Sequence, residues 1–311
     1  MPFKASPGKG TKAAGLFNSV KKESAYVTGP LDRYLTELPP DGGDRAINVN
    51  APSAIGSCPR SIWYARTGAK QDSGFIEPRT RRIFDNGHHV HARLQKYLLD
   101  AGLLLLDEAP VRSDRHCIQG HTDGILSIDG ATGELGVLEI KSINDGNFRD
   151  LRDAKREHKR QALIYLHCLE ERRRELRRGH RTFQGFAGSI HERIAYYGSL
   201  YAHIADGGGR SGEAKLARKL ERHSVLDSLL YKCRIPMTKA VLVYENKNDQ
   251  SMKEFVVDAG TKEGAGIVAE LLAQCALVNE AVEKGLAPAR EGAGKSDPVC
   301  RWCNYRAACW G

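Results

Sequence analysis

Two acidic residues and a lysine lie in a short, otherwise apolar stretch of the chain. The segment "GHTDGILSIDGATGELGVLEIKSI" contains Asp123 near its start and both Glu139 and Lys141 near its end. Its turn-forming centre, "DGATGE", predicts a hairpin of two strands over 125–128 and 136–143. Residues two apart on a strand share a face, so Glu139 and Lys141 point the same way. Asp123 is predicted at the start of the partner strand.

This combination of side chains is suited to binding a metal ion. Burying a carboxylate or an ammonium group among Val, Leu and Ile costs free energy unless a counter-charge is present. A divalent cation held by Asp123 and Glu139 would supply that charge, and oxygen ligands favour Mg²⁺ or Mn²⁺. Lys141 would then orient or help activate a water and stabilise charge on a phosphate. The alternative is a surface hairpin with an ordinary salt bridge, and the short D…ExK pattern by itself favours that alternative.

A helix predicted over 79–101 comes before the hairpin. Its apolar residues recur at helical spacing, and Gly102 ends it. It carries three histidines, His88, His89 and His91. Of these, His91 borders the apolar face and is the one expected to point toward the sheet.

A second helix, predicted over 148–178, follows the hairpin. Gln161 and Tyr165 are four apart and share one face of it. The region 155–181 holds ten Lys or Arg and four Glu, which is +6 of the chain's formal charge of +9. Such a cluster favours a polyanionic partner, and Lys159 and Arg160 are the predicted phosphate contacts. A solvated helix face with Glu–Arg pairs is the alternative.

Four short motifs occur in sequence order on the predicted elements: Gly87-x-x-x-His91, Gly120-x-x-Asp123, Glu139-x-Lys141 and Gln161-x-x-x-Tyr165. Together they resemble the RecB-type nucleases of the PD-(D/E)XK superfamily. The resemblance implies an α/β, restriction-endonuclease-like fold with a mixed central sheet flanked by helices. It also implies residue roles: His91, Asp123 and Glu139 as ligands of Mg²⁺ or Mn²⁺, Lys141 as a catalytic residue, and Gln161 and Tyr165 as supporting contacts beside DNA.

The C-terminal sequence "VCRWCNYRAACWG" contains three cysteines, Cys300, Cys303 and Cys309. Thiolates select iron–sulfur clusters or zinc, and a fourth ligand is needed. On ligand chemistry alone zinc is favoured. One branch of the same nucleases carries one cysteine before the catalytic motifs and three after them, holding a [4Fe–4S] cluster. This branch includes CRISPR-associated adaptation exonucleases and AddB nuclease domains. The resemblance therefore implies Cys58 as the fourth ligand and a C-terminal Fe–S clasp, with zinc as the alternative.

The organisation predicted from the 311 residues is one nuclease domain over 51–311 after a flexible basic tail, 1–50. A helical insertion is predicted at about 171–236, strands on both sides of Asn246–Gln250, and a last helix over 262–284. The cysteines without metal-like spacing are predicted to be buried: Cys117, Cys168, Cys233 and Cys275.

Composition and the resemblance together limit the functional classes. The longest strongly apolar stretch, "AGLLLL" at residues 101–106, is too short to span a bilayer. No signal peptide is recognisable, so a cytoplasmic protein of a bacterium or of a phage-infected host is predicted. The resemblance implies metal-dependent exonucleolytic hydrolysis of DNA at single-stranded ends, in recombination, repair or CRISPR adaptation. A helicase, recombinase or CRISPR-adaptation protein is the expected partner. The competing hypothesis is a non-catalytic DNA-binding or assembly protein on the same fold.

Overall fold

The computed structural model describes residues 26–38, 48–72, 76–130, 132–178 and 209–311. The chain divides into two compact units, one of residues 1–42 and 73–86 and the other of residues 43–72 and 87–311. In the first unit, Arg82 pairs with Asp32 of helix α2 (Thr28–Glu37). This helix lies inside the segment predicted from sequence to be a flexible tail.

A five-stranded mixed sheet forms the centre of the second unit. Its strands are β1 (Leu104–Ser113), β2 (Ile118–Asp129), β3 (Glu134–Ile143), β4 (Lys239–Asn246) and β5 (Met252–Asp258). They lie side by side in chain order, and all neighbours are antiparallel except β3 and β4, which are parallel. The predicted α/β class with a mixed sheet is confirmed, as are the hairpin and the two later strands.

Two details of the hairpin region differ from the sequence prediction. Strand β2 begins at Ile118, so Asp123 lies in the middle of the strand rather than at its start. Strand β1 was not predicted as a separate element, and it contains Pro110, which cannot donate to a ladder. Because β1 is an edge strand, that proline is tolerated.

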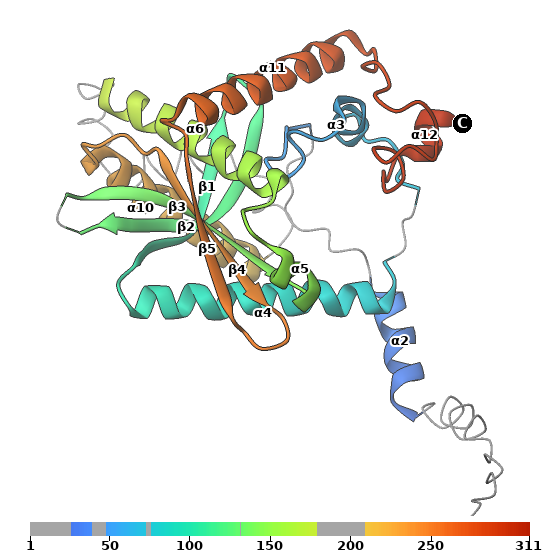
Figure 1. Cartoon of the computed structure of the whole chain (residues 1–311), viewed down its shortest axis with the longest axis horizontal. Helices are drawn as coiled ribbons and strands as arrows, with labels where there is room; N and C mark the ends of the chain where they lie inside the picture. The colour runs from blue at the N-terminus through green and yellow to red at the C-terminus, as the bar shows by residue number, and fades with distance from the viewer. Residues whose placement is uncertain (1–25, 39–47, 73–75, 131, 179–208) are drawn as a thin grey trace, which may run out of the picture. The chain divides into compact units, whose positions relative to one another are not determined.

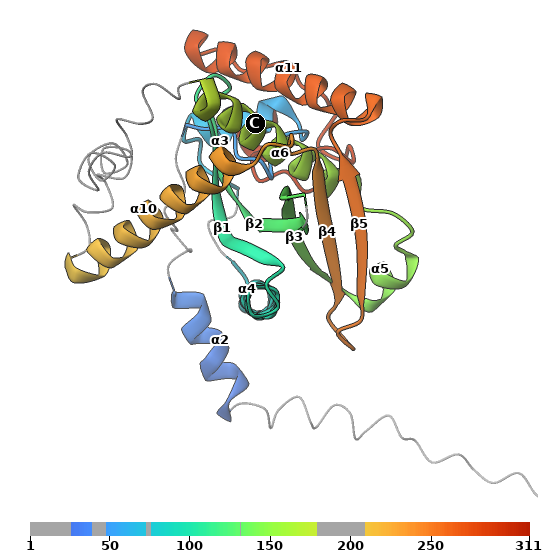
Figure 2. The same ribbon diagram turned by 90° about the vertical axis from the view of Figure 1, so that its left-hand side faces the viewer.

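Helices cover both faces of the sheet. After α2, the helices of the described residues are α3 (Pro59–Arg66), α4 (Pro78–Asp100), α5 (Asp145–Asp150), α6 (Arg156–Arg178), α10 (Gly209–Lys232), α11 (Lys262–Lys284) and α12 (Arg306–Trp310), of which α3 and α12 lie away from the sheet. Helices α6 and α11 lie on one side of the strands, and residues 87–100 of α4 lie on the other (Figures 1 and 2). Two buried clusters correspond to these faces. Val90 and Leu94 of α4 pack with Ile140, whereas the larger cluster joins the sheet to α6 and α11.

The long helix predicted over 148–178 is broken into α5 and α6. The chain leaves helical geometry at Leu151, which is buried, and helix α6 starts at Arg156. Lys253 Nζ of β5 donates to the carbonyls of Phe148 and Leu151, at 2.6 and 3.0 Å. These bonds satisfy acceptors that a continuous helix would have used internally, so the break is stabilised by a tertiary contact that local sequence does not show.

Helix α11 extends over Lys262–Lys284, as the sequence predicted. By length and composition it is also apolar enough to cross a membrane, so the expectation that no such stretch exists was wrong for this helix. One such helix is weak evidence for a membrane. Its Gln274 Oε1 accepts from Gly56 N at 2.7 Å, its Asn279 bonds Asn50 and Arg66, and Leu271 is fully buried.

The segment 171–236, predicted as a helical insertion, includes the end of helix α6 as well as helix α10. Helix α6 continues through its first eight residues without interruption, and residues 179–208 lie outside the described part of the chain. Helix α10 begins within the glycine-rich sequence that was predicted to be a break. Ion pairs Arg172–Asp227 and Arg222–Asp107 join α10 to α6 and β1. In the described residues, α10 is therefore packed on the sheet domain.

The arginine-rich part of α6 contains a buried ion pair. Arg173 and Glu170 have side chains only 8% and 10% exposed, and they are joined by bonds of 2.7 and 2.8 Å. Glu170 also accepts from Arg174 and from the backbone N–H of Met237, and Arg173 donates to the carbonyl of Cys233. This network connects α6 to the chain entering β4, so Arg173 is structural rather than free for nucleic acid.

Glu170→Ala is expected to destabilise the protein by about 3–5 kcal/mol, because it leaves the buried Arg173 guanidinium without its counter-charge. Urea unfolding followed by circular dichroism measures the change. Glu175→Ala, which removes a mostly exposed carboxylate from the same helix, is the control and should change stability by no more than about 0.5 kcal/mol. Equal losses for the two variants would contradict the structural role.

Candidate active site

The register of β2 and β3 brings the two acidic residues together. Gly124 is paired with Leu138, which places Asp123 at the level of Glu139 on the neighbouring strand. Alternation along β3 puts Glu139 and Lys141 on one face and Leu138 and Ile140 on the other, where the latter two pack against α4. The same-face arrangement of Glu139 and Lys141 is as predicted from sequence.

Asp123 is held by both of its carboxylate oxygens. Oδ2 accepts from the backbone N–H of Ile140 at 2.5 Å, and Oδ1 lies 3.1 Å from His91 Nδ1 on α4. The next residue, Gly124, allows β1 to come close: a Cβ there would lie 2.7 Å from the carbonyl oxygen of Leu106. Because Gly124 has no side chain, β1 can pack closely against β2 beside Asp123.

Glu139 is a buried carboxylate paired with Lys141. Their side chains are 3% and 22% exposed, and Lys141 Nζ lies 2.5 Å from Glu139 Oε1. Burial, and next the negative charge of Asp123, raise the pKa of Glu139 to about 7, although Lys141 acts in the opposite direction. Two carboxylates thus share a poorly solvated site with one ammonium group and the His91 ring.

A chain of hydrogen bonds runs from the lysine to helix α6. Lys141 Nζ donates to Gln161 Oε1 at 3.3 Å, and Gln161 Nε2 donates to the Tyr165 hydroxyl at 2.8 Å. Burial raises the pKa of Tyr165 well above its ordinary value, so the hydroxyl stays protonated. The i, i+4 spacing predicted from sequence therefore serves to orient Lys141.

The first turn of α6 is held in place by Tyr244 of β4. Its hydroxyl accepts from the backbone N–H of Lys155 at 3.0 Å and lies 2.8 Å from His158 Nδ1. Tyr244 is paired with Lys141 across the parallel strands β3 and β4. The adjacent strands β3 and β4 thus position both Lys141 and helix α6, which orients that lysine.

Among the three histidines of α4, only His91 contacts the acidic residues. His88 and His89 are exposed. Burial alone would lower the pKa of His91, but the hydrogen bond to Asp123 and its negative charge outweigh this and raise it. The ring is therefore held beside the carboxylate, where the sequence placed the candidate ligand.

Sequence reasoning missed four residues around this site. Gln95 of α4 donates to Glu108 Oε1 at 3.0 Å and to the Asp123 carbonyl at 2.8 Å. Burial raises the pKa of Glu108, and Asp123 adds to the effect. Arg93 donates to both oxygens of the buried Glu245 at 2.7 Å, which ties α4 to β4. The spacing of Arg93 and Gln95 around His91 was visible in the sequence, but their partners were not.

Both predicted phosphate contacts, Lys159 and Arg160, form ion pairs within the protein. Arg160 is 13% exposed and donates to the Gly56 carbonyl and to Glu270 of α11. Lys159 pairs with the exposed Asp153. Arg160 therefore joins α6 to α11.

The donor set suits a hard divalent cation. Mn²⁺ and Mg²⁺ accept two carboxylates and an imidazole as ligands, and a cation would offset the repulsion between the two carboxylates that raises the pKa of Glu139. His91, Asp123 and Glu139 would hold it. The grouping His91, Asp123, Glu139, Lys141, Gln161 and Tyr165 remains a prediction as a catalytic set, but the structure brings all six into one connected site.

The four predicted cluster cysteines also come together. Cys58, at the start of α3, and Cys300, Cys303 and Cys309 line one pocket. All four are free thiols. Backbone hydrogen bonds from the Arg60, Ser61 and Glu291 segments reach Cys58, although burial raises its pKa overall.

The pocket contains space that a side chain would fill. A Cβ at Gly292 would lie 2.6 Å from Cys300 Sγ. Arg290 stacks on Trp310 and donates to the Cys309 carbonyl. Four thiols around a space kept open by glycine fit a metal centre. Cys168, Cys233 and Cys275 are buried as predicted, whereas Cys117 is only half-buried, in the β1–β2 turn.

Comparison with known proteins gives only distant likenesses. No protein-family model matches the chain, and no curated protein matches it. An alkaline exonuclease (LHK-Exo) from Laribacter hongkongensis is similar with a TM-score of 0.40 and 11% identity, covering 76% of this chain and 91% of that one. The protein SSO0001 is similar with a TM-score of 0.38 and 14% identity, covering 90% and 92%. At these TM-scores the likenesses do not bear on function, which must follow from the site.

Metal binding at the acidic site is expected to weaken as pH falls below about 7. A cation needs the Glu139 carboxylate, and below a pKa of about 7 a proton occupies it. The raised pKa of His91 acts in the same direction. Calorimetric titration with Mn²⁺ should show affinity about tenfold lower at about pH 6 than at about pH 8. Equal affinities at both pH values would contradict the geometry.

Gly292→Ala is expected to lower the metal content of the cysteine pocket, because the added methyl group would meet Cys300 Sγ. The measurement is iron, sulfide and zinc per chain after anaerobic purification, with the midpoint of thermal unfolding. Gly294→Ala is the matched control in the same loop, since a Cβ there meets nothing within 4 Å. If both variants keep the metal content of the wild type, the pocket does not hold the centre.

Proposed function

We propose that this protein is a metal-dependent DNA exonuclease of the RecB-type PD-(D/E)XK class that acts on single-stranded ends. One observation supports this most strongly: His91 from α4, Asp123 from β2, Glu139 and Lys141 from β3, and Gln161 and Tyr165 from α6 form one connected polar site. The order of the motifs along the chain is the second support, because it is the order that those nucleases share.

The roles of the residues follow from their contacts. A divalent cation held by His91, Asp123 and Glu139 would bind the scissile phosphate and lower the pKa of a water. Lys141, fixed between Glu139 and Gln161, positions that water and stabilises the charge that develops on the phosphate. The Gln161–Tyr165 pair keeps the ammonium group in place, because Gln161 can donate to the tyrosine only while its carbonyl faces Lys141.

A structural role is proposed for the cysteine pocket. Its ligands come from both ends of the domain and include none of the proposed catalytic residues, so a [4Fe–4S] cluster there would tie residues 58 and 300–309 together. Zinc is the alternative occupant. Iron and sulfide analysis distinguishes the two.

The cellular setting is proposed from charge and from the motif resemblance. The formal charge of +9 suits a nucleic-acid substrate in the cytoplasm. A helicase, a recombinase or a CRISPR-adaptation protein would supply DNA ends to the site. Recombination, repair and CRISPR adaptation are all compatible with such an activity.

The direct test is degradation of end-labelled single-stranded DNA with Mg²⁺ or Mn²⁺. Lys141→Ala is expected to reduce the rate by about 10²–10⁴-fold, because it removes the group that positions the water and offsets charge at the phosphate. The order in which label is released from the 5′ and 3′ ends gives the polarity.

Lys96→Ala is the matched control, since it removes an exposed lysine of α4 and should leave the rate unchanged. Metal-loaded wild type that retards DNA on a gel without cutting it would overturn the enzymatic proposal. That result would favour the non-catalytic DNA-binding protein on the same fold.

A further inference from the structure

A second cluster of metal-binding side chains lies away from the acidic site. His116 is in the turn between β1 and β2, and His167 and Glu171 are one turn apart on α6. The ligand atoms of these three residues all lie within 4.8 Å of one another. None of the three belongs to the proposed catalytic set or to the cysteine pocket.

One ring nitrogen of His167 makes no hydrogen bond in the described residues. Its Nε2 is buried and has no hydrogen-bond partner among the residues that the structure describes. Leaving such an atom unsatisfied costs free energy, which a metal–nitrogen bond would recover. The His116 ring stands edge-on to it, with ring centres 5.6 Å apart.

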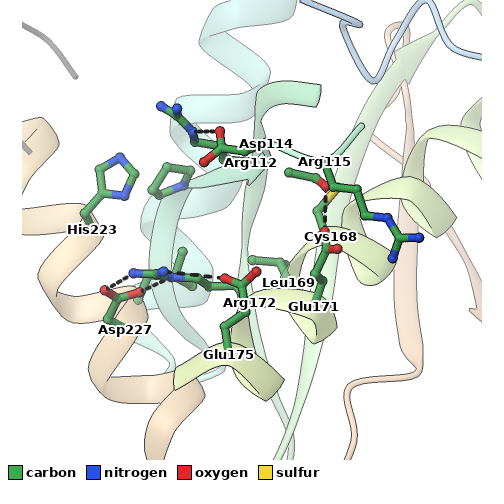
Figure 3. A pocket seen from close by; sticks show the side chains of 13 residues that line it. Arg112, Asp114, Arg115, Cys168, Leu169, Glu171, Arg172, Glu175, His223 and Asp227 are labelled. Carbon is green, nitrogen blue, oxygen red and sulfur yellow. Dashed lines mark hydrogen bonds and ion pairs between the residues drawn. The ribbon is translucent and has the colours of Figure 1, made fainter. Parts of the chain in front are cut away.

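A serine that does not belong to the cluster orients the Glu171 carboxylate. Ser113 Oγ donates to Glu171 Oε2 at 2.5 Å, which leaves the other oxygen for a cation. Figure 3 shows Glu171 on α6 facing the β1–β2 turn, which carries Arg115. Asn50 Nδ2 donates to the carbonyl of His116 at 2.8 Å and fixes the turn. Hydrogen bonds that orient ligands in this way are typical of metal sites.

The type of ion follows from the donors. Two imidazoles and one carboxylate suit Zn²⁺ and similar transition metals better than Mg²⁺. In a tetrahedral zinc site the ligand atoms are spaced roughly 3.4 Å apart, so small side-chain rotations would close the cluster. The nearby Arg115 and Arg174 oppose a cation, but Arg174 is paired with Glu170 and Glu171 supplies a negative charge.

We propose that His116, His167 and Glu171 bind one zinc-class divalent ion that fastens the β1–β2 turn to α6. The same helix carries Gln161 and Tyr165, so the ion would stiffen the element that orients Lys141. This proposal does not depend on the nuclease activity, because its readouts are metal content and stability.

The test is zinc binding by the intact protein with its cysteine centre in place, in excess Mg²⁺. Equilibrium dialysis should give one zinc per chain more for wild type than for His167→Gln, with binding at that site weakened at least tenfold. Zinc should raise the unfolding midpoint of wild type but not of the variant.

Two further variants make the result decisive. Glu171→Gln keeps an acceptor for Ser113 and the shape of the side chain but loses the anionic ligand, so it should fold normally and also lose the extra zinc. His89→Gln changes an exposed histidine of α4 and should bind zinc as wild type does. If His167→Gln and Glu171→Gln both bind zinc as tightly and as fully as wild type, the site does not exist.

Discussion

The central constraint on this structure is the burial of the Glu139 carboxylate beside Asp123. Two acids in a poorly solvated site repel each other, and the raised pKa of Glu139 expresses that cost. Lys141 offsets part of it. The surrounding fold offsets the remaining cost. The backbone N–H of Ile140 donates to Asp123, the imidazole of His91 lies beside the same carboxylate, and the sheet holds these groups in place. A protein built only for stability would gain by replacing such a cluster with apolar residues.

The elements around the site are arranged to hold that cluster. The parallel β3–β4 pair sets Lys141 beside Tyr244, and Tyr244 in turn holds the first turn of α6. Arg93 and Gln95 fix α4 through Glu245 and Glu108. The catalytic candidates thus come from β2, β3, α4 and α6, each joined to its neighbour by a buried polar contact. Precise positioning on regular elements is what metal-dependent chemistry requires.

Metal-ligating residues recur outside the acidic site. Four cysteines at the two ends of the second unit line one pocket, and two histidines with a glutamate lie between a strand turn and α6. Both groups join segments distant in sequence. A metal that binds between such segments in the folded state, and not in the unfolded chain, would add its binding free energy to the stability of the fold. The molecule would therefore combine one proposed catalytic site with two further proposed metal centres that hold elements together.

Local sequence determined much of this protein. Hydrophobic periodicity placed α4, α11 and the β2–β3 hairpin, because side-chain direction follows residue spacing in helices and strands. The same spacing put Glu139 with Lys141, and Gln161 with Tyr165, on common faces. Only tertiary structure decided what those faces meet. The break after Leu151 depends on Lys253, the engagement of Arg160 depends on Glu270, and the contact between His167 and His116 depends on sheet register. Pairings across such distances along the chain arise only when the chain is folded, because no local propensity encodes the partner.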